Sequence, residues 1–239
     1  VEYESYINFY GNDLCPPYPA CLEEWHIGYQ STEECITVCA DELKEIDGEC
    51  YDEADLDALQ DIIDNNASLD SSMTPLSLGY QDWDDSRLVS FFLNHNSITY
   101  LPESLGDLDS LETLFIMGNE LTALPESIVD LSNLEMLSIT DNQLTSLPSN
   151  ITNLSNLKEL NVAYNQLTSL PDQICDLNDL HDIDVNHNHL CQKYYGGGWN
   201  SSSTFDCIDG SSWGDQEESN CCDGENGEFH WTACLPTGC

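Results

Sequence analysis

The stretch LETLFIMGNELTALPESIVDLSN, residues 111–133, is followed at once by a close copy, LEMLSITDNQLTSLPSNITNLSN, residues 134–156. Both units share one apolar frame, with asparagine at the ninth place and proline at the fifteenth. The leucines that open such units recur every 23 residues, at Leu88, Leu111, Leu134, Leu157 and Leu180. A fixed period of this length predicts stacked coils, each burying its apolar side chains against the next.

The shared frame, LxxLxLxxNxLxxLPxxIxxLxx, extends over residues 88–190. It resembles the leucine-rich-repeat family, and the resemblance implies an α/β solenoid whose ends are closed by caps. Within the frame, LxxLxLxxN alternates inward and outward positions as a short strand does, so we expect short parallel strands on the concave side. Proline after the leucine at the fourteenth place favours an irregular rather than a helical convex side.

An asparagine occupies the ninth place of every unit. The chain turns there, and its interior backbone groups need hydrogen-bond partners. An amide side chain can donate and accept at once, so it can join two adjacent coils. We therefore expect a ladder of inter-coil contacts made by Asn96, Asn119, Asn142, Asn165 and Asn188.

The chain is strongly acidic, with 4 Lys plus Arg against 45 Asp plus Glu and a formal charge of −41. Nucleic acid and anionic membrane surfaces need a basic face, so both are excluded as partners. A solvated acidic surface is the simplest interpretation, and a salty medium would screen its self-repulsion. The alternative is Ca²⁺ held between acidic loops, although neither of the two acidic runs has EF-hand spacing. These runs are Asp82, Asp84 and Asp85, and Asp52, Glu53, Asp55 and Asp57.

The 12 cysteines lie in two groups towards the ends of the chain, five at residues 15–50 and seven at residues 175–239. Zinc is a weak alternative because no paired CxxC knuckles occur, so disulfides in an exported protein are the better interpretation. The chain has no apolar run of membrane-spanning length, and its start at Val1 suggests a processed or incomplete product. The expected disulfide cysteines are Cys15, Cys21, Cys35, Cys39, Cys50, Cys175, Cys191, Cys207, Cys221, Cys222, Cys234 and Cys239.

The segments around the repeats suggest four regions. Residues 1–50 form a Cys-rich segment. Ile7 to Cys15 echo Ile183 to Cys191, so the segment is expected to begin with a partial repeat and its cap. A linker is expected to follow over residues 36–52. Residues 51–87 form an N-terminal cap, with an amphipathic helix expected over 54–64. Residues 88–190 are the repeats, and 191–239 form a C-terminal Cys-rich cap and tail.

The outward strand positions define a candidate ligand-binding surface. Apolar side chains gather near its N-terminal end, whereas Glu159, Asp182 and Asp184 make the other end acidic. A graded concave surface of this kind is how solenoids bind partners, although incidental apolar exposure is the alternative. The candidate binding residues are Phe92, Phe115, Met117, Met136 and Tyr164.

No catalytic constellation is recognised, because the chain has no nucleophile elbow, P-loop or HExxH motif. His181, His187 and His189 with two nearby aspartates suggest a metal site only weakly, so no metal or cofactor is predicted. Four sequons are glycosylation candidates, and in a source that N-glycosylates exported proteins we expect at least one to be occupied. They begin at Asn66, Asn150, Asn153 and Asn200.

These features predict a non-catalytic extracellular or cell-surface protein. The first interpretation is a structural or adhesive subunit that associates head to tail with other copies in a fibre or surface layer. Its contacts would join residues 1–35 of one subunit to 191–239 of the next. Five cysteines lie at residues 15–50 and seven at 175–239, both odd numbers, so full oxidation requires a disulfide between the two groups. The alternative is a monomeric recognition module that binds a protein or glycan on the concave face.

Overall fold

The computed structural model describes residues 39–171 and 173–190. By its internal contacts the chain divides into two compact units, Val1–Asp52 and Glu53–Cys239, which are described separately. The predicted partial repeat at residues 1–35, the predicted cap and tail at 191–239 and nine of the cysteines lie outside the described residues. Within the described part, no helix is both long enough and apolar enough to cross a membrane.

The described part of the first unit is a β-hairpin. Strands β1 (Leu43–Ile46) and β2 (Glu49–Asp52) pair antiparallel. They are joined by the two residues Asp47 and Gly48, whose φ angles are 53° and 90°. An Asp-Gly pair with positive φ at both positions gives the twist that a two-residue hairpin turn requires. The segment predicted as a linker is therefore folded over these residues.

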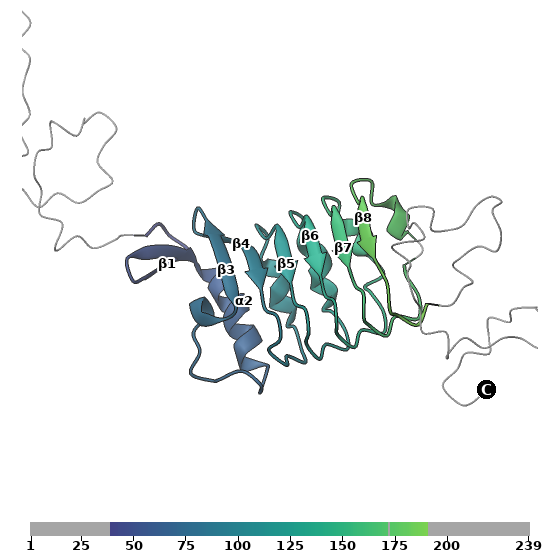
Figure 1. Ribbon diagram of the computed structural model, residues 1–239. Helices are drawn as coiled ribbons and strands as arrows, with labels where there is room; N and C mark the ends of the chain where they lie inside the picture. Colours follow the sequence, from purple (N-terminus) through teal and green to yellow (C-terminus); the bar gives the residue numbers. More distant parts are fainter. Residues whose placement is uncertain (1–38, 172, 191–239) are drawn as a thin grey trace, which may run out of the picture. The chain divides into compact units, whose positions relative to one another are not determined.

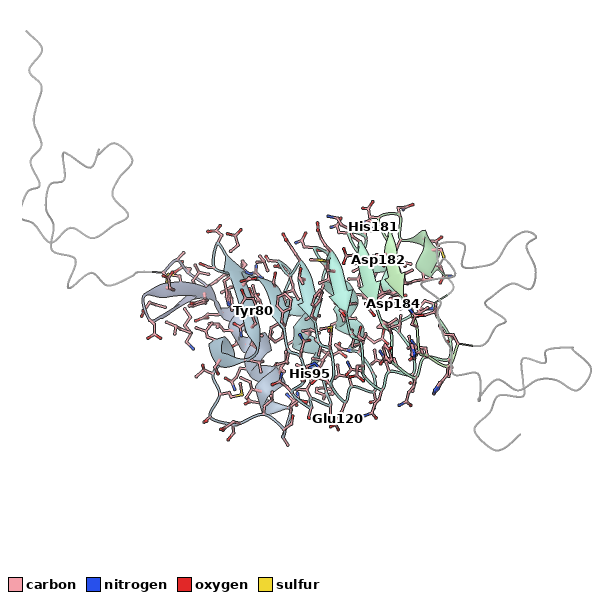
Figure 2. The ribbon with its side chains drawn as sticks, in the orientation of Figure 1. Tyr80, His95, Glu120, His181, Asp182 and Asp184 are labelled. Atoms are coloured by element: carbon pink, nitrogen blue, oxygen red, sulfur yellow. A yellow bond between two sulfur atoms is a disulfide. The ribbon has the colours of Figure 1, made fainter. Side chains whose placement is uncertain are left out.

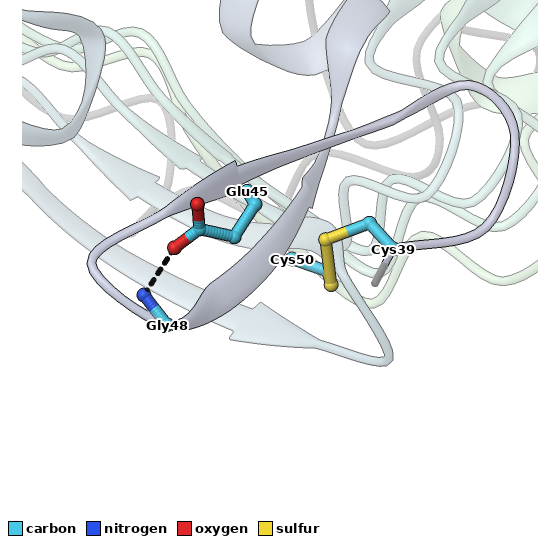
Figure 3. Close-up of a disulfide and its surroundings, with 4 residues drawn as sticks. All are labelled: Cys39, Glu45, Gly48 and Cys50. Atoms are coloured by element: carbon cyan, nitrogen blue, oxygen red, sulfur yellow. Dashed lines mark hydrogen bonds between the residues drawn. A yellow bond between two sulfur atoms is a disulfide. The ribbon is translucent and has the colours of Figure 1, made fainter. Parts of the chain in front are cut away.

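Two further contacts hold this hairpin together (Figure 3). Cys39 and Cys50 form a disulfide with their Cα atoms 5.6 Å apart. At the turn, the backbone N–H of Gly48 donates a 2.6 Å hydrogen bond to the Glu45 carboxylate. Two strands alone are marginally stable in water, so the cross-link supplies order that a hairpin of this size cannot obtain from burial.

The second unit begins with helix α2 (Glu53–Asp64), which confirms the helix predicted over residues 54–64. Its apolar residues recur at helical spacing and are buried in the same core as the first coil. Both ends of an apolar solenoid need such a cover, because the terminal coil would otherwise expose its interior. The buried apolar side chains of the helix are Leu56, Ala58, Leu59, Ile62 and Ile63.

A buried carboxylate joins α2 to the sheet. Asp55, in the first turn of α2, is fully buried and accepts hydrogen bonds from Arg87 Nε at 3.0 Å and Nη2 at 2.9 Å. The same carboxylate accepts a 2.8 Å hydrogen bond from the backbone N–H of Leu88. Arg87 also pairs with Asp109 at 2.7 Å. A buried charge needs partners of this kind, and here they fix the start of the first coil.

The sheet has six strands in sequence order (Figure 1). The first two strands pair antiparallel and all later neighbours pair parallel. Gly79, with φ of 65°, precedes the first strand, and a Cβ there would lie 2.3 Å from the carbonyl oxygen of Phe92. The close antiparallel approach therefore requires glycine at this position. The strands are β3 (Tyr80–Asp84), β4 (Arg87–Phe92), β5 (Thr113–Phe115), β6 (Met136–Ser138), β7 (Glu159–Asn161) and β8 (Asp182–Asp184).

Each convex segment holds one short 3₁₀ helix, and no α-helix occurs on that side of the described coils. The prolines predicted that the convex side has no α-helix, but they did not predict that each convex segment contains a short 3₁₀ helix. A 3₁₀ turn suits a short segment that must bring one apolar side chain per coil into the core. The 3₁₀ helices are η1 (Pro75–Ser77) before the repeats, then η2 (Glu103–Asp107), η3 (Glu126–Asp130), η4 (Ile151–Asn153) and η5 (Ile174–Asp176).

The apolar positions of the frame form one continuous core through the repeats. In the second repeat, Leu111, Leu114, Ile116, Leu121 and Ile128 are all fully buried. Equivalent positions in the neighbouring coils are buried in the same way. The fold is thus the predicted α/β leucine-rich-repeat solenoid, with its core running from α2 to Leu190.

The asparagine ladder is present from Asn119 onward, and each of its members forms hydrogen bonds with the preceding coil. Asn142 Oδ1 accepts a 3.0 Å hydrogen bond from the backbone N–H of Leu121, and its Nδ2 donates to the Ile116 carbonyl at 2.8 Å. Asn119, Asn165 and Asn188 make the equivalent contacts. Asn96 differs, because the antiparallel β3 precedes its coil instead of another repeat, and its Nδ2 donates to the Asn94 carbonyl within its own coil. The predicted five-member ladder therefore has four members.

Candidate binding site on the concave sheet

Strand pairing aligns the outward side chains into two columns that cross the concave sheet. Because the strands are in register, side chains on the same face of neighbouring strands lie next to one another. The first concave column is Asp82, Ser90, Thr113, Met136, Glu159 and Asp182. The second concave column is Tyr80, Phe92, Phe115, Ser138, Asn161 and Asp184.

The second column begins with a row of three aromatic rings. Phe92 lies edge-on to Tyr80, with ring centroids 5.5 Å apart, and edge-on to Phe115 at 5.1 Å. Tyr80 is 62% exposed, and the two phenylalanines are half-buried. The Tyr80 hydroxyl donates a 3.0 Å hydrogen bond to Asp82, which raises the pKa of the phenol above its ordinary value. Tyr80 thus extends the predicted apolar patch by one strand.

A pocket of about 260 Å³ lies beside this row, over strands β5 to β8. Phe115, Met117 and Met136 form its apolar side, and each is half-buried. Ser138, only 6% exposed, stands next to Phe115 in the second column, where a small side chain leaves room above the sheet. The remaining lining residues are Leu137, Glu159, Leu160, Asn161, Asp182 and Asp184.

The other side of the pocket is acidic. Glu159 and Asp182 are exposed neighbours on β7 and β8, and Asp184 follows on β8. Figure 2 shows Tyr80 at the β3 end of the sheet and Asp182 with Asp184 at the β8 end. Asp184 accepts hydrogen bonds from both the backbone and the side-chain amide of Asn186. Polarity therefore changes along the pocket, from aromatic and thioether groups to carboxylates.

The described lysine and arginine side chains of the second unit form ion pairs with carboxylates outside the pocket. Arg87 pairs with Asp55 and Asp109, and Lys158 pairs with Glu135 at 2.6 Å. Within the described residues, none of the ion pairs involves Glu159, Asp182 or Asp184. The exposed carboxylates of Glu159 and Asp182 and the half-buried carboxylate of Asp184 therefore form no ion pair with a positive side chain from the described part of the fold.

Tyr164, one of the predicted binding residues, does not line the pocket. It belongs to a column of residues with positive φ that follows the strands, together with His95, Gly118, Asp141 and His187. Its ring stacks on the imidazole of His187, with centroids 4.1 Å apart and planes 13° from parallel. Tyr164 remains 53% exposed, so it forms a separate aromatic surface beside the strands.

The acidic runs considered for Ca²⁺ do not converge. Asp55 is buried against Arg87, which gives its carboxylate a structural role. Asp82 accepts the hydrogen bond of Tyr80. Across residues 39–171 and 173–190, no group of three His, Cys, Asp or Glu side chains is placed to hold a metal ion, the histidines near β8 included.

The sequons fall in different environments. Asn66 is 2% exposed, and its Nδ2 donates hydrogen bonds to the carbonyls of Ile62 at 2.8 Å and Tyr100 at 2.9 Å. A glycan on Nδ2 would displace one of these hydrogens and would have to enter the core, which makes Asn66 the least accessible of the described candidates. Asn150 and Asn153 are exposed on the convex side at η4, and Asn200 lies outside the described residues.

A family match and one similar solved structure have this architecture. Residues 88–196 match the family described as leucine-rich repeat region. A chain of the BIR3–SERK2 complex from Arabidopsis thaliana is similar, with a TM-score of 0.52, 23% identity and coverage of 66% of this chain and 92% of that chain. A leucine-rich-repeat protein of Leptospira interrogans is 32% identical over 43% of this chain and 32% of its own, with a TM-score of 0.35.

InlP of Listeria monocytogenes is 29% identical over 46% of this chain and 30% of its own, with a TM-score of 0.39. Among curated protein sequences none matches the chain. The family match and the shared fold together show that the repeat region of this chain is a leucine-rich-repeat solenoid.

Proposed function

We propose that this chain is a non-catalytic interaction protein that binds a polypeptide partner on its concave sheet. The observation that supports this most is the continuity of the aromatic row with the pocket, since Phe115 belongs to both. Exposed aromatic and methionine side chains in a depression are typical of protein-binding surfaces, where they bury much area and adapt to the partner.

Export to an oxidising compartment is part of the same proposal. The Cys39–Cys50 disulfide supports it, and Cys175 at η5 is disulfide-bonded as well. Disulfides persist outside the cytosol and are rare within it. Among the described sequons, Asn150 and Asn153 are the exposed candidates for glycosylation, and they lie away from the strands, so glycans there would leave the concave sheet open.

A displayed library of random linear peptides tests the binding proposal. The protein should enrich a set of peptides whose affinity falls at least tenfold in the double variant Phe92→Ser, Phe115→Ser. The matched control is Tyr100→Ser, which removes an aromatic ring that is 48% exposed and lies outside the strands. Circular dichroism must show that both variants remain folded. Enriched peptides that bind the double variant as well as they bind the wild type would refute the concave site.

Head-to-tail self-association is the alternative function. Its predicted contacts involve residues 1–35 and 191–239, which lie outside the described residues, and no feature of the described part favours it. Light scattering at high concentration, with and without reductant, tests it. A single monomeric species under both conditions would exclude the alternative, whereas growth that stops on reduction would favour disulfide-linked assembly.

A further inference from the structure

Resting on the proposed concave binding site, we infer that its ligand is a polypeptide segment that pairs an aromatic or long aliphatic side chain with a basic side chain. The apolar side chain lies against Phe115, Met117 and Met136. The basic side chain reaches the carboxylates of Glu159 and Asp182. The segment therefore crosses the strands from β5 toward β8.

The apolar half of the site is suited to one large side chain. Phe115 forms an edge-to-face pair with Phe92 and also lines the pocket, so it joins the aromatic row to the apolar side of the site. Met136 and Met117 complete that side, and their thioether side chains can adjust to an aromatic ring or a branched aliphatic group. The buried Ser138 keeps the floor low between them and Asn161.

The acidic half calls for a cation from the ligand. Glu159 and Asp182 are exposed, adjacent and without an ion-pair partner among the described residues. Asp184 already accepts two hydrogen bonds from Asn186, so it contributes mainly charge. Like charges directly opposite on paired strands repel each other, and a ligand cation between them relieves that repulsion. Lysine or arginine supplies this charge at the end of an apolar stem that can lie along the sheet.

The strand spacing fixes how far apart the two ligand side chains must be. Neighbouring strands lie about 4.8 Å apart, so the step from β5 or β6 to β7 or β8 spans roughly 5–14 Å. An extended peptide advances about 3.3 Å per residue. The basic residue is therefore expected two to four positions from the apolar one in the ligand sequence.

The peptide selection described above tests this inference when it is run at physiological salt, where non-specific attraction to so acidic a protein is screened. The test variant is Glu159→Gln, Asp182→Asn, Asp184→Asn. The matched control is Asp107→Asn, Glu126→Gln, Asp130→Asn, which removes the same number of charges from exposed residues at η2 and η3 on the convex side.

Peptides selected on the wild type should contain lysine or arginine two to four positions from an aromatic or long aliphatic residue. Their affinity should fall at least tenfold in the concave triple variant and less than twofold in the convex control. Equal losses in both variants would mean non-specific charge attraction and would overturn the inference. Selected peptides that depend on Phe92 and Phe115 but lack basic residues would also overturn it, while leaving the proposed function intact. A selection without any enriched peptide would overturn the proposed function itself.

Discussion

Asn142→Ala is the most direct test of how the coils are held together. Asn142 is 8% exposed and lies between two coils. Its Oδ1 accepts the backbone N–H of Leu121 at 3.0 Å, and its Nδ2 donates to the Ile116 carbonyl at 2.8 Å. Leu121 and Ile116 are both fully buried. Alanine removes both contacts and leaves one donor and one acceptor in the core without the partner that the fold provides.

The expected loss follows from these two groups. A buried polar group without a partner costs about 1–3 kcal/mol, so two groups cost about 2–6 kcal/mol. Water can reach part of the space that the amide leaves, and the coils can relax, so we expect about 2–4 kcal/mol of unfolding free energy to be lost. That is a large fraction of the stability of an ordinary domain, which is about 5–15 kcal/mol.

Urea denaturation followed by circular dichroism measures this loss, with Asn156→Ala as the matched control. Asn156 is exposed, and its Nδ2 donates one 2.7 Å hydrogen bond to the Ser132 carbonyl of the neighbouring coil. That substitution should cost no more than about 1 kcal/mol, because water can replace an exposed hydrogen bond. Equal losses in the two variants would refute the argument that burial gives the ladder its effect.

Three further predictions concern charges. Asp55→Asn should destabilise the protein by about 3 kcal/mol, since it breaks a buried pair, whereas Asp109→Asn, whose side chain is 65% exposed, should cost less than about 1 kcal/mol in the same urea experiment. Raising NaCl from about 0.01 M to about 1 M shortens the Debye length from about 30 Å to about 3 Å and should raise the thermal midpoint, because the formal charge is −41. A fall in the midpoint would show that attractive pairs dominate instead. The Ser127 backbone N–H holds the pKa of Glu103 below its ordinary value of 4.5, so this carboxylate contributes stability above that pH and loses it as the pH falls through the lowered pKa. The stability difference between the wild type and Glu103→Gln should therefore shrink below pH 4.5 in acid titrations.

The solenoid could be predicted from the sequence because its contacts are local and repeated. Every coil buries the same frame against the next, so the spacing of Leu111 and Leu134 already determines which side chains meet. The same register placed Phe115 and Met136 on the outward face, where they now line one pocket. Helix α2 was predictable for a similar reason, since its apolar spacing lies within a single segment.

The features that the sequence did not predict depend on contacts between segments that are not related by the 23-residue repeat. Tyr80 joins the aromatic row only because β3 pairs antiparallel with β4, and the sequence does not give that register. The Asp55–Arg87 pair spans 32 residues and looks in the sequence like any other pair of charges in an acidic chain. Tyr164 was placed at the binding site from its column alone, which could not show that its ring stacks on His187.

The N-terminal end of the sheet shows how a solenoid closes without another coil. The coils that open at Leu88, Leu111, Leu134 and Leu157 each form hydrogen bonds with an asparagine of the next repeat, but the first coil also needs partners on its outer side. Asn66 provides them, since its Oδ1 accepts the backbone N–H groups of Thr99 at 2.9 Å and Tyr100 at 3.1 Å, while Asp55 accepts that of Leu88. Side chains from α2 and the loop after it thus do for the first coil what the ladder does for the others. Each coil is stabilised mainly by its neighbours, so a loss of stability in the first coil should spread into the repeats. The hydrogen bonds of Asn66 and Asp55 therefore support the concave binding surface as the buried leucines do.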